Sequence, residues 1–274
     1  MKESFLKERG IYYRINDFEP TRPTLVFVHG LSGSSSAWFP YEKIFQTKYN
    51  ILSYDLRGHG KSAKPPKYGD YCLDNFADDL ACLVASQKIE NCVLISHSFG
   101  TLISLLFLSK YPNRVRAAVF LSPSFAVSKR KLAKATRPFL SLVNLLRPFP
   151  FHPKTGKHID YSLYPNSGDW NIPRMIADVG NTTLRVYLYC TKQSYGFDQE
   201  NFLQKINIPV LLIHGKKDTI FPADNSVFMS QKIKGSEIIL IPNADHIIAL
   251  NNVKEITEAT RDFVEKNLTL ITHR

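Results

Sequence analysis

The sequence predicts an α/β fold in which helices flank a mostly parallel central sheet. Short runs rich in β-branched and aromatic residues alternate with segments of helical length, which is the pattern of parallel strands joined by crossover helices. Several of these runs are uninterrupted apolar stretches, as expected of strands that are buried on both faces. A chain of 274 residues is long enough to build one substantial core without dividing in two.

Seven segments have the composition and the flanking turns of strands. Because they alternate with helical patterns, we expect most of them to lie parallel in a single sheet. In chain order they are Ile11–Ile15, Thr24–His29, Asn50–Asp55, Cys92–Ser96, Val115–Leu121, Val210–His214 and Glu237–Ile241.

Helical spacing is clearest in three segments. Apolar residues over 73–84 recur at i, i+3 and i+4. The segment Thr101–Lys110 is apolar and stops shortly before a proline. The last helix is expected over Asn252–Asn267, where Asn252 and Glu255 form an N-terminal capping pair.

The alternation stops between the fifth and sixth predicted strands. This stretch contains a basic, leucine-rich helix candidate over Lys129–Leu146, which Pro138 kinks or divides, and a second helical stretch over 172–190. An insertion of this size between two core strands is most simply a helical cap or lid over one end of the sheet. We therefore expect two parts, a core of residues 1–123 and 205–274 and an inserted helical cap of residues 124–204.

The basic character of the chain has one source. The formal net charge is +11, and the stretch from Asn91 to Ile159 contains eleven Lys and Arg residues but no Asp or Glu. A general nucleic-acid binder would carry a recognised motif or basic residues along a repeating face, and the sequence has neither. We therefore expect no nucleic acid among its partners.

Part of this basic stretch has the pattern of an amphipathic helix. Arg130, Lys134 and Arg137 keep i, i+4, i+7 spacing, while apolar residues such as Phe139 and Leu140 can share another face. A basic amphipathic helix can make transient contact with a membrane surface or dock an anionic substrate. The simpler alternative is a cap helix that packs its apolar side on the core and leaves its charges in solvent.

The sequence predicts a cytoplasmic protein. Its start, MKESFLKERG, is too polar for a signal peptide, and no apolar run approaches the ~18 residues of a membrane helix. The four cysteines form no CxxC pair and are too sparse for a disulfide framework.

The segment ISHSFGT, residues 95–101, places Ser98 between a predicted strand and a predicted helix. This is the context of the nucleophile elbow G-x-S-x-G, a sharp turn that presents a reactive serine. The turn needs small residues two positions before and two positions after the serine. Gly100 supplies one of them, and Ser96 stands where the first glycine belongs. The alternative is an ordinary capping serine, since serines often begin helices.

A serine hydroxyl becomes a good nucleophile at neutral pH only when a histidine accepts its proton and a carboxylate orients that histidine. In enzymes built on this turn, the partners follow in the chain order Ser, Asp, His. Asp218 and His246 each follow a predicted strand, so both are expected on loops at the carboxyl edge of the sheet. Asp245 and Asp224 are weaker candidates for the acid.

The segment VFVHGLSGSS, residues 26–35, is a strand followed by a glycine-containing loop. In enzymes of this kind, such a loop supplies one of the backbone N–H groups that stabilise the oxyanion formed from the substrate carbonyl. We expect the two donors to be the N–H groups of Leu31 and Phe99. The alternative is a plain strand, turn and helix whose glycines serve only the turn.

Five segments together resemble the successive signatures of the α/β-hydrolase superfamily: VFVHG, YDLRGHGKS, LISHSFG, LLIHGKKD and IPNADH. They occur in the family's order over residues 26–246, and five loose motifs in order are far more specific than any one of them. The resemblance implies an eight-stranded sheet, a cap over the site, and Ser98, Asp218 and His246 as nucleophile, orienting acid and base. It does not fix the substrate, because this fold hosts many activities.

No cofactor or metal is expected. GHGKS, residues 58–62, contains the end of a phosphate-binding P-loop, but Asp55 stands where that motif needs glycine. His29, His97 and His214 each end or adjoin a strand without a second ligand at metal-binding spacing, so we interpret them as packed, hydrogen-bonded residues. Serine rather than aspartate at position 98 argues against an epoxide hydrolase or a dehalogenase.

The sequence thus predicts a cofactor-free serine hydrolase of the carboxylesterase or lipase type, whose partner is a small ester with an apolar acyl group. The alternatives are a C–C bond hydrolase or thioesterase with the same triad, and a small-molecule receptor on the same fold. Five aromatic residues of the cap are candidates to line an apolar pocket, or else to fasten the cap to the core: Phe149, Phe151, Tyr161, Tyr164 and Trp170.

Overall fold

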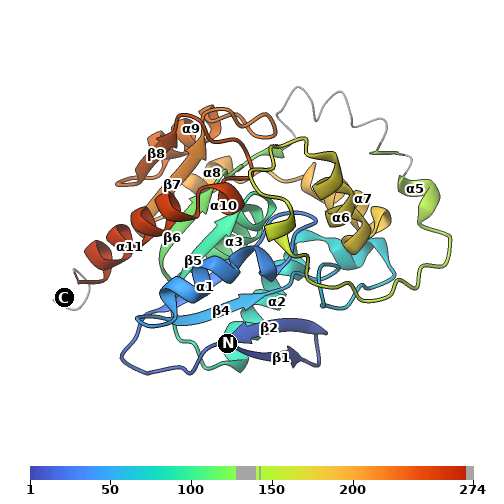
Figure 1. Ribbon diagram of the computed structural model, residues 1–274, viewed down its shortest axis with the longest axis horizontal. Coiled ribbons are helices and arrows are strands. Elements are labelled where there is room, and N and C mark those ends of the chain that lie inside the picture. Colours follow the sequence, from blue (N-terminus) through green and yellow to red (C-terminus); the bar gives the residue numbers. More distant parts are fainter. Residues whose placement is uncertain (128–139, 142, 270–274) are drawn as a thin grey trace.

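The computed structural model describes residues 1–127, 140–141 and 143–269. In these residues an eight-stranded sheet forms the centre of the molecule, with strand order β1-β2-β4-β3-β5-β6-β7-β8 (Figure 1). The first two strands are antiparallel to their neighbours and all later pairings are parallel. The predicted α/β fold with a mostly parallel sheet is therefore confirmed. The strands are Lys2–Leu6 (β1), Ile11–Ile15 (β2), Thr24–Val28 (β3), Asn50–Tyr54 (β4), Cys92–His97 (β5), Val115–Leu121 (β6), Val210–Gly215 (β7) and Glu237–Ile241 (β8).

The sequence prediction missed one strand, β1. Its residues KESFL are exposed except for Leu6, so the segment lacks the apolar pattern of a buried strand. β1 is held by its hairpin pairing with β2, which runs from Lys2 opposite Ile15 to Leu6 opposite Ile11. The eighth strand implied by the family resemblance is this edge strand.

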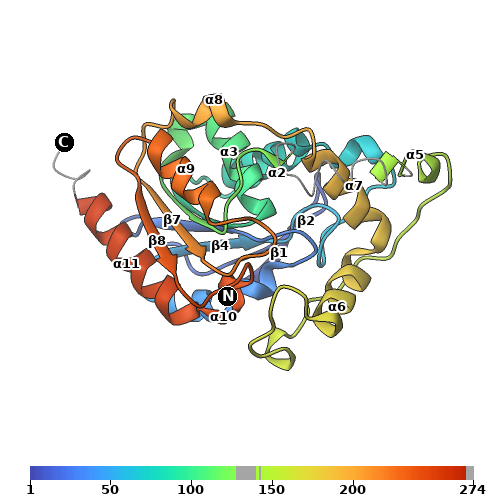
Figure 2. The ribbon, with the colours of Figure 1, turned by 90° about the horizontal axis from the view of Figure 1, so that it is seen from above.

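Helices cover both faces of the sheet (Figure 2). Those in the described residues are Phe39–Phe45 (α1), Leu73–Ser86 (α2), Phe99–Lys110 (α3), Val143–Leu146 (α5), Ile172–Thr182 (α6), Leu184–Ser194 (α7), Glu200–Leu203 (α8), Asp224–Lys232 (α9), Ile248–Asn251 (α10) and Val253–Thr269 (α11). α2, α3 and α9 pack on one face, whereas α1, α10 and α11 pack on the other. The three clearest helix predictions correspond to α2, α3 and α11. None of these helices is both long enough and apolar enough to cross a bilayer.

The central strands are apolar on both sides because each face of the sheet has its own buried cluster. In β3, Val26 and Val28 belong to the cluster under α2 and α3. Leu25 and Phe27 belong to the cluster under α1 and α11. Side chains of a strand alternate between faces, so a strand covered on both sides is a continuous apolar run. This double packing gives the loops at the carboxyl edge a firm base.

Residues 124–204, here called the cap segment, follow β6 and precede β7. The described part contacts loops at the carboxyl edge of the sheet. Ser36 Oγ donates to the carbonyl of Ile159 (2.9 Å), and Thr182 Oγ1 donates to the carbonyl of Ser32 (3.1 Å). Both core partners lie in the loop that follows β3. The described part of the cap segment thus contacts the edge at which the candidate site residues are expected.

The basic helix expected over Lys129–Leu146 falls largely outside the described residues, since 128–139 and 142 are not among them. Val143–Leu146 forms the short helix α5, in which Val143 is buried. The predicted basic flank also lies outside the described residues: Arg130, Lys134 and Arg137.

The single helical stretch expected over 172–190 is two helices, α6 and α7. Thr183 separates them with a left-handed backbone (φ 81°), a conformation that an α-helix cannot contain. The preceding Thr182 is buried and anchored to the loop after β3. The prediction of one helix was wrong because this break depends on a contact with a distant loop, which the local pattern does not show.

The polar side of α6 faces inward. Arg174 and Asp178, four positions apart, are buried, whereas Ile172 and Ile176 are each 67% exposed. A surface helix normally buries its apolar side. The reversal places a charged helix face over the carboxyl edge of the sheet.

The start of α3 lies very close to the end of β3. A Cβ atom at Gly100 would lie 2.5 Å from the carbonyl oxygen of Val28 and 2.7 Å from that of His29. Both are backbone atoms, which cannot turn aside as a flexible side chain can. Glycine at position 100 is therefore required for this approach of helix to strand.

We expect Gly100→Ala to lower the free energy of unfolding by about 1–3 kcal/mol, the usual effect of overpacking a filled site. The matched control is Gly180→Ala in α6, where an added Cβ meets nothing within 4 Å. Alanine there favours the helix by roughly 0.5–1 kcal/mol. Urea unfolding followed by circular dichroism measures both variants. Equal stability of Gly100→Ala and the wild-type protein would contradict the packing argument.

Candidate active site

Ser98 forms the turn between β5 and α3 by itself, with φ 51° and ψ −116°. Residues other than glycine rarely adopt such angles, and they do so where the surrounding structure holds them. The N–H of Ser98 donates to the carbonyl of Leu121 on β6 (3.0 Å), and its carbonyl accepts the Thr101 hydroxyl (2.6 Å). Ser96, in the place of the usual first glycine, is buried on β5, and the turn forms with that side chain present.

The three residues predicted from strand-end positions meet at this turn. His246 Nε2 lies 2.7 Å from Ser98 Oγ, and His246 Nδ1 lies 2.7 Å from Asp218 Oδ2. Since a carboxylate can only accept, Nδ1–H donates to Asp218 and Nε2 accepts the hydroxyl proton of Ser98. All three side chains are buried. The arrangement can move a proton from the serine to the imidazole.

The carboxylate of Asp218 accepts hydrogen bonds at both oxygens. Oδ1 accepts the N–H groups of Ile220 (2.8 Å) and Phe221 (2.6 Å), and Oδ2 accepts from His246 and from Nε2 of His214 (3.0 Å). Burial by itself raises the pKa of Asp218, but the hydrogen bonds from the two imidazoles outweigh it and hold the pKa well below its usual value. Asp218 is therefore ionised at neutral pH.

His214 is a member of this network whose contact with Asp218 the sequence analysis missed. Its Nε2–H is shared between Asp218 Oδ2 and the carbonyl of Phe221 (2.9 Å), while its Nδ1 lies 2.7 Å from Ser226 Oγ. The interpretation of His214 as packed and hydrogen-bonded is correct. The sequence does contain a signal for this contact. His214 lies at the end of β7, and Asp218 lies in the turn that follows directly, so the two side chains are close along the chain.

His97 and His29 fix the backbone around the site. His97 donates through Nε2 to the carbonyl of His246 (2.8 Å). The ring of His29 accepts the N–H of Leu56 (3.0 Å) and donates to the carbonyl of Gly30 (2.8 Å). Burial lowers the pKa of His97 to about 3 and that of His29 to about 4, so both rings are neutral. Their interpretation as packed, hydrogen-bonded residues is confirmed.

The two weaker acid candidates have other environments. Asp224 is exposed in the first turn of α9. The side chain of Asp245 accepts the N–H of Ile247 (2.9 Å), so it makes a local hydrogen bond within the loop after β8. The carboxylate at hydrogen-bonding distance from His246 Nδ1 is that of Asp218.

The two candidate oxyanion donors lie beside Ser98. Phe99 is the first residue of α3, and N–H groups in the first turn of a helix have no acceptor within the helix. Leu31, in the loop after β3, lines the same pocket as Ser98. The close approach of α3 to β3 at Gly100 brings these two segments together.

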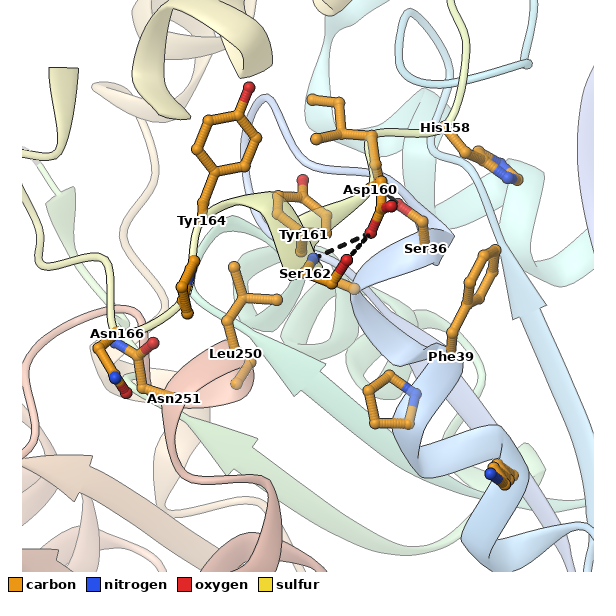
Figure 3. Close-up of a pocket in the computed structure, with 16 residues that line it drawn as sticks. Ser36, Phe39, His158, Asp160, Tyr161, Ser162, Tyr164, Asn166, Leu250 and Asn251 are labelled. Carbon is orange, nitrogen blue, oxygen red and sulfur yellow. Dashed lines mark hydrogen bonds between the residues drawn. The ribbon is translucent and has the colours of Figure 1, made fainter. Parts of the chain in front are cut away.

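Two neighbouring cavities lie at this edge of the sheet. A small pocket of about 80 Å³ is lined by Ser98 and His246. The second cavity, here called the chamber, has a volume of about 860 Å³, and Figure 3 shows residues that line it. The chamber wall is largely apolar, with Phe39, Ile159 and Tyr164 among its side chains. The two cavities share four lining residues, Ala37, Tyr161, Ala249 and Leu250.

The cap segment gives the small pocket a polar wall. Tyr161 donates its hydroxyl to Asp178 Oδ1 (2.9 Å), and Arg174 donates to Asp178 Oδ2 (2.7 Å). Burial raises the pKa of Asp178 to about 6, against the opposing effects of Arg174 and Tyr161. A buried ion pair therefore faces the pocket that holds Ser98.

The expectation for the cap aromatics holds only in part. Tyr161 and Tyr164 line the chamber (Figure 3). Phe149 and Trp170 are largely exposed, and Phe151 packs on the hydrophobic core. The first alternative, lining of a pocket, therefore applies to Tyr161 and Tyr164. The second, fastening of the cap segment to the core, applies to Phe151 and to Trp170, whose Nε1 donates to the Thr219 hydroxyl (2.9 Å).

The GHGKS segment is a structural turn. Asp55 is buried and accepts the N–H groups of Ser35 and Lys61, each at 2.7 Å. Gly58 and Gly60 adopt positive φ angles of 80° and 47°, which glycine tolerates without strain. In the part of the chain that the structure describes, no three His, Cys, Asp or Glu side chains are grouped to hold a metal ion.

Comparisons with known proteins agree with this architecture. A family model described as alpha/beta hydrolase fold matches residues 23–253. The chain is 27% identical to a putative non-heme chloroperoxidase of Synechocystis sp., over 93% of this chain and 95% of the relative. It is 26% identical to a bifunctional esterase/perhydrolase of Acinetobacter calcoaceticus, with the same two coverages.

A solved structure shows the same fold. The alpha/beta hydrolase enzyme MGS-M2, from a deep-sea metagenome library of the Medee basin, superposes with a TM-score of 0.76 at 21% identity. The match covers 96% of this chain and 97% of the other. From the family model that spans most of its length, the chain belongs to the alpha/beta hydrolase fold family.

Proposed function

We propose that the protein is a serine hydrolase that cleaves carboxylic ester bonds through an acyl-enzyme intermediate. The observation that carries the proposal is the hydrogen-bonded line from Ser98 through His246 to Asp218, with 2.7 Å at both steps, beside a pocket. The similarity to an esterase/perhydrolase is consistent with ester chemistry.

In the proposed acylation step, Ser98 Oγ attacks the ester carbonyl carbon while His246 Nε2 takes the hydroxyl proton. The carbonyl oxygen becomes an oxyanion, which the N–H groups of Leu31 and Phe99 stabilise. Asp218, ionised and in contact with Nδ1, stabilises the imidazolium that forms. When the tetrahedral intermediate collapses, the C–O bond to the alcohol breaks and His246 returns its proton to the leaving oxygen.

Deacylation repeats these roles with water as the nucleophile. His246 Nε2 removes a proton from water, whose oxygen attacks the acyl carbon, and the same imidazole then protonates Ser98 as the acid leaves. The neutral His97 holds the carbonyl of His246, which keeps the base in one place through both steps. No cofactor takes part in this cycle.

The two cavities suggest where each part of an ester substrate binds. The small pocket has room for the ester group and little more, and the Arg174–Asp178 pair forms part of its wall. The adjoining chamber is larger and mostly apolar, so it suits the bulkier apolar part of the substrate. Tyr161 lines both cavities, so we expect it to contact the substrate where its ester group meets its apolar part.

Ser98→Ala is expected to lower kcat by about 10⁴-fold or more, because the nucleophile is lost while its surroundings stay in place. Steady-state hydrolysis of p-nitrophenyl butyrate measures this, and loss of labelling by a fluorophosphonate probe reports on the same hydroxyl. An unchanged melting temperature shows that the variant folds. Wild-type turnover by the variant would refute the assignment.

A panel of substrates separates the proposal from its alternatives. Multiple turnovers with p-nitrophenyl esters support an esterase, whereas preference for an acyl thioester or a vinylogous 1,5-diketone would point to a thioesterase or a C–C hydrolase. Ligand-induced thermal shifts without turnover of any of these would point to a receptor.

Asp218→Asn should lower kcat by about 10⁴-fold, because an amide offers an N–H where two imidazoles need an acceptor. Asp224→Asn is the matched control, since this carboxylate is exposed on α9. Its kcat should stay within about twofold of the wild-type value, as for other surface changes. If the two variants lose activity equally, Asp218 is not the orienting acid.

Ile159→Trp places a larger side chain in the chamber and not in the small pocket. We expect kcat/KM for an octanoate ester to fall about tenfold or more, a typical penalty for overpacking by 1–3 kcal/mol. For an acetate ester it should change less than about twofold. Ile159→Val is the control, since it keeps the wall apolar without filling it. A uniform change across chain lengths would contradict binding in the chamber.

A further inference from the structure

The cap segment supplies a buried carboxylate to the two loops that carry Asp218 and His246. Asp169 Oδ1 accepts the backbone N–H of His246 (2.7 Å). Its Oδ2 accepts the backbone N–H of Thr219 (2.9 Å) and the Thr219 hydroxyl (2.7 Å). Thr219 directly follows Asp218 in the chain. One side chain of the cap segment thus joins the loop after β7 to the loop after β8.

We propose that Asp169 is a positioning residue, which sets the distance between the acid and the base and makes their alignment depend on the seating of the cap segment. The inference rests on the proposed roles of Asp218 and His246. Asp169 itself touches neither the hydroxyl of Ser98 nor the imidazole ring. It acts through the backbone of the residues that do.

The chemistry of the contact requires a carboxylate. Two of the three donors are backbone N–H groups, which cannot reverse their role. A carboxylate accepts at both oxygens. The amide of asparagine has the same size but only one acceptor oxygen. In Asp169→Asn, one of the two backbone N–H groups would therefore lose its acceptor and face the NH₂ group of the amide. A buried N–H that loses its acceptor bears the full cost of its lost hydration, so the loop that carries it is expected to shift.

The peptide of His246 is held from two sides. Its N–H is bound by Asp169 of the cap segment, and its carbonyl is bound by His97 at the end of β5. The ring is then aligned by Asp218. If the hydrogen bond from Asp169 is lost, the His246 peptide keeps only the hydrogen bond of these two that its carbonyl makes with His97. The loop after β8 can then rotate about that carbonyl. A displacement near 1 Å can lower a catalytic rate by about 100-fold.

Asp169 is itself held in place by its neighbours. Arg174 donates to the carbonyls of Gly168 (3.5 Å) and Asp169 (3.3 Å) while it pairs with Asp178. Trp170, next in the chain, donates Nε1 to the Thr219 hydroxyl (2.9 Å). The same helix face that lines the small pocket therefore also orients the turn that presents Asp169.

The test compares Asp169→Asn, which keeps the size, with Asp169→Glu, which keeps the charge. We expect Asp169→Asn to lower kcat about 10–100-fold with KM within about threefold, since the substrate cavities are untouched. Asp169→Glu should retain more of kcat, because both oxygens can still accept. Asp224→Asn serves as the charge control and should match the wild type. Assays are run well below the melting temperature of each variant.

Hydrogen exchange gives a readout that does not depend on catalysis. In Asp169→Asn, peptides covering 216–222 and 243–249 should exchange faster than in the wild type, while peptides from β5 should not. If exchange in these peptides is unchanged, Asp169 does not hold the two loops. If exchange is faster but kcat stays within twofold of the wild-type value, Asp169 holds the loops without positioning the acid and the base. Equal kcat for the Asn and Glu variants also overturns the positioning role.

If Asp169→Asn fails to fold, Thr219→Val serves in its place, because it removes the hydroxyl that donates to Asp169 and accepts from Trp170 but leaves both backbone N–H donors to Asp169. Its kcat is expected to fall about 2–10-fold, less than in Asp169→Asn because two of the three hydrogen bonds to Asp169 remain, and an unchanged kcat would overturn the inference. Failure of the proposed function has a different signature, namely wild-type turnover by Ser98→Ala, and the exchange experiment is unaffected by that result.

Discussion

The site depends on one backbone constraint, the left-handed turn at Ser98. A strand and a helix can be joined by a single residue only if the helix starts almost in contact with the neighbouring strand, which Gly100 permits. Phe99 directly follows Ser98 in the chain, and Leu31, in the loop after β3, lines the same pocket as Ser98. The sheet thus fixes the serine directly, and the strain of its dihedral angles is balanced by the packing of β3, β5 and α3.

The acid and the base are fixed in a different way, by hydrogen bonds between loops. Burial lowers the pKa of His29 to about 4 and that of His97 to about 3, against the opposing charges of nearby carboxylates, so these two rings stay neutral. The ring of His246 differs from these two because it contacts the carboxylate of Asp218 on one side and the hydroxyl of Ser98 on the other. The structure therefore separates histidines that hold backbone from the one that can exchange a proton with Ser98.

Much of this arrangement could be predicted from the sequence, for a physical reason. The carboxyl ends of parallel strands meet at one edge, so residues that follow separate strands, such as Ser98, Asp218 and His246, are brought together by the fold itself. β1 escaped prediction because an exposed edge strand has no apolar pattern. The contacts of Asp169 escaped it because they require the cap segment to be seated, and no local pattern encodes which distant N–H a carboxylate will reach.

The orientation of α6 shows the limit of periodicity most clearly. The spacing of Arg174, Asp178, Ile172 and Ile176 defines an amphipathic helix, but it does not say which side is buried. The ion pair is oriented inward because each charge has a partner there, with Tyr161 and the carbonyls near Asp169 completing the set. A buried charge without such partners would be strongly destabilising. The polar face of α6 therefore has two structural roles. It forms part of the wall of the small pocket, and it binds the turn from which Asp169 reaches the backbone of His246.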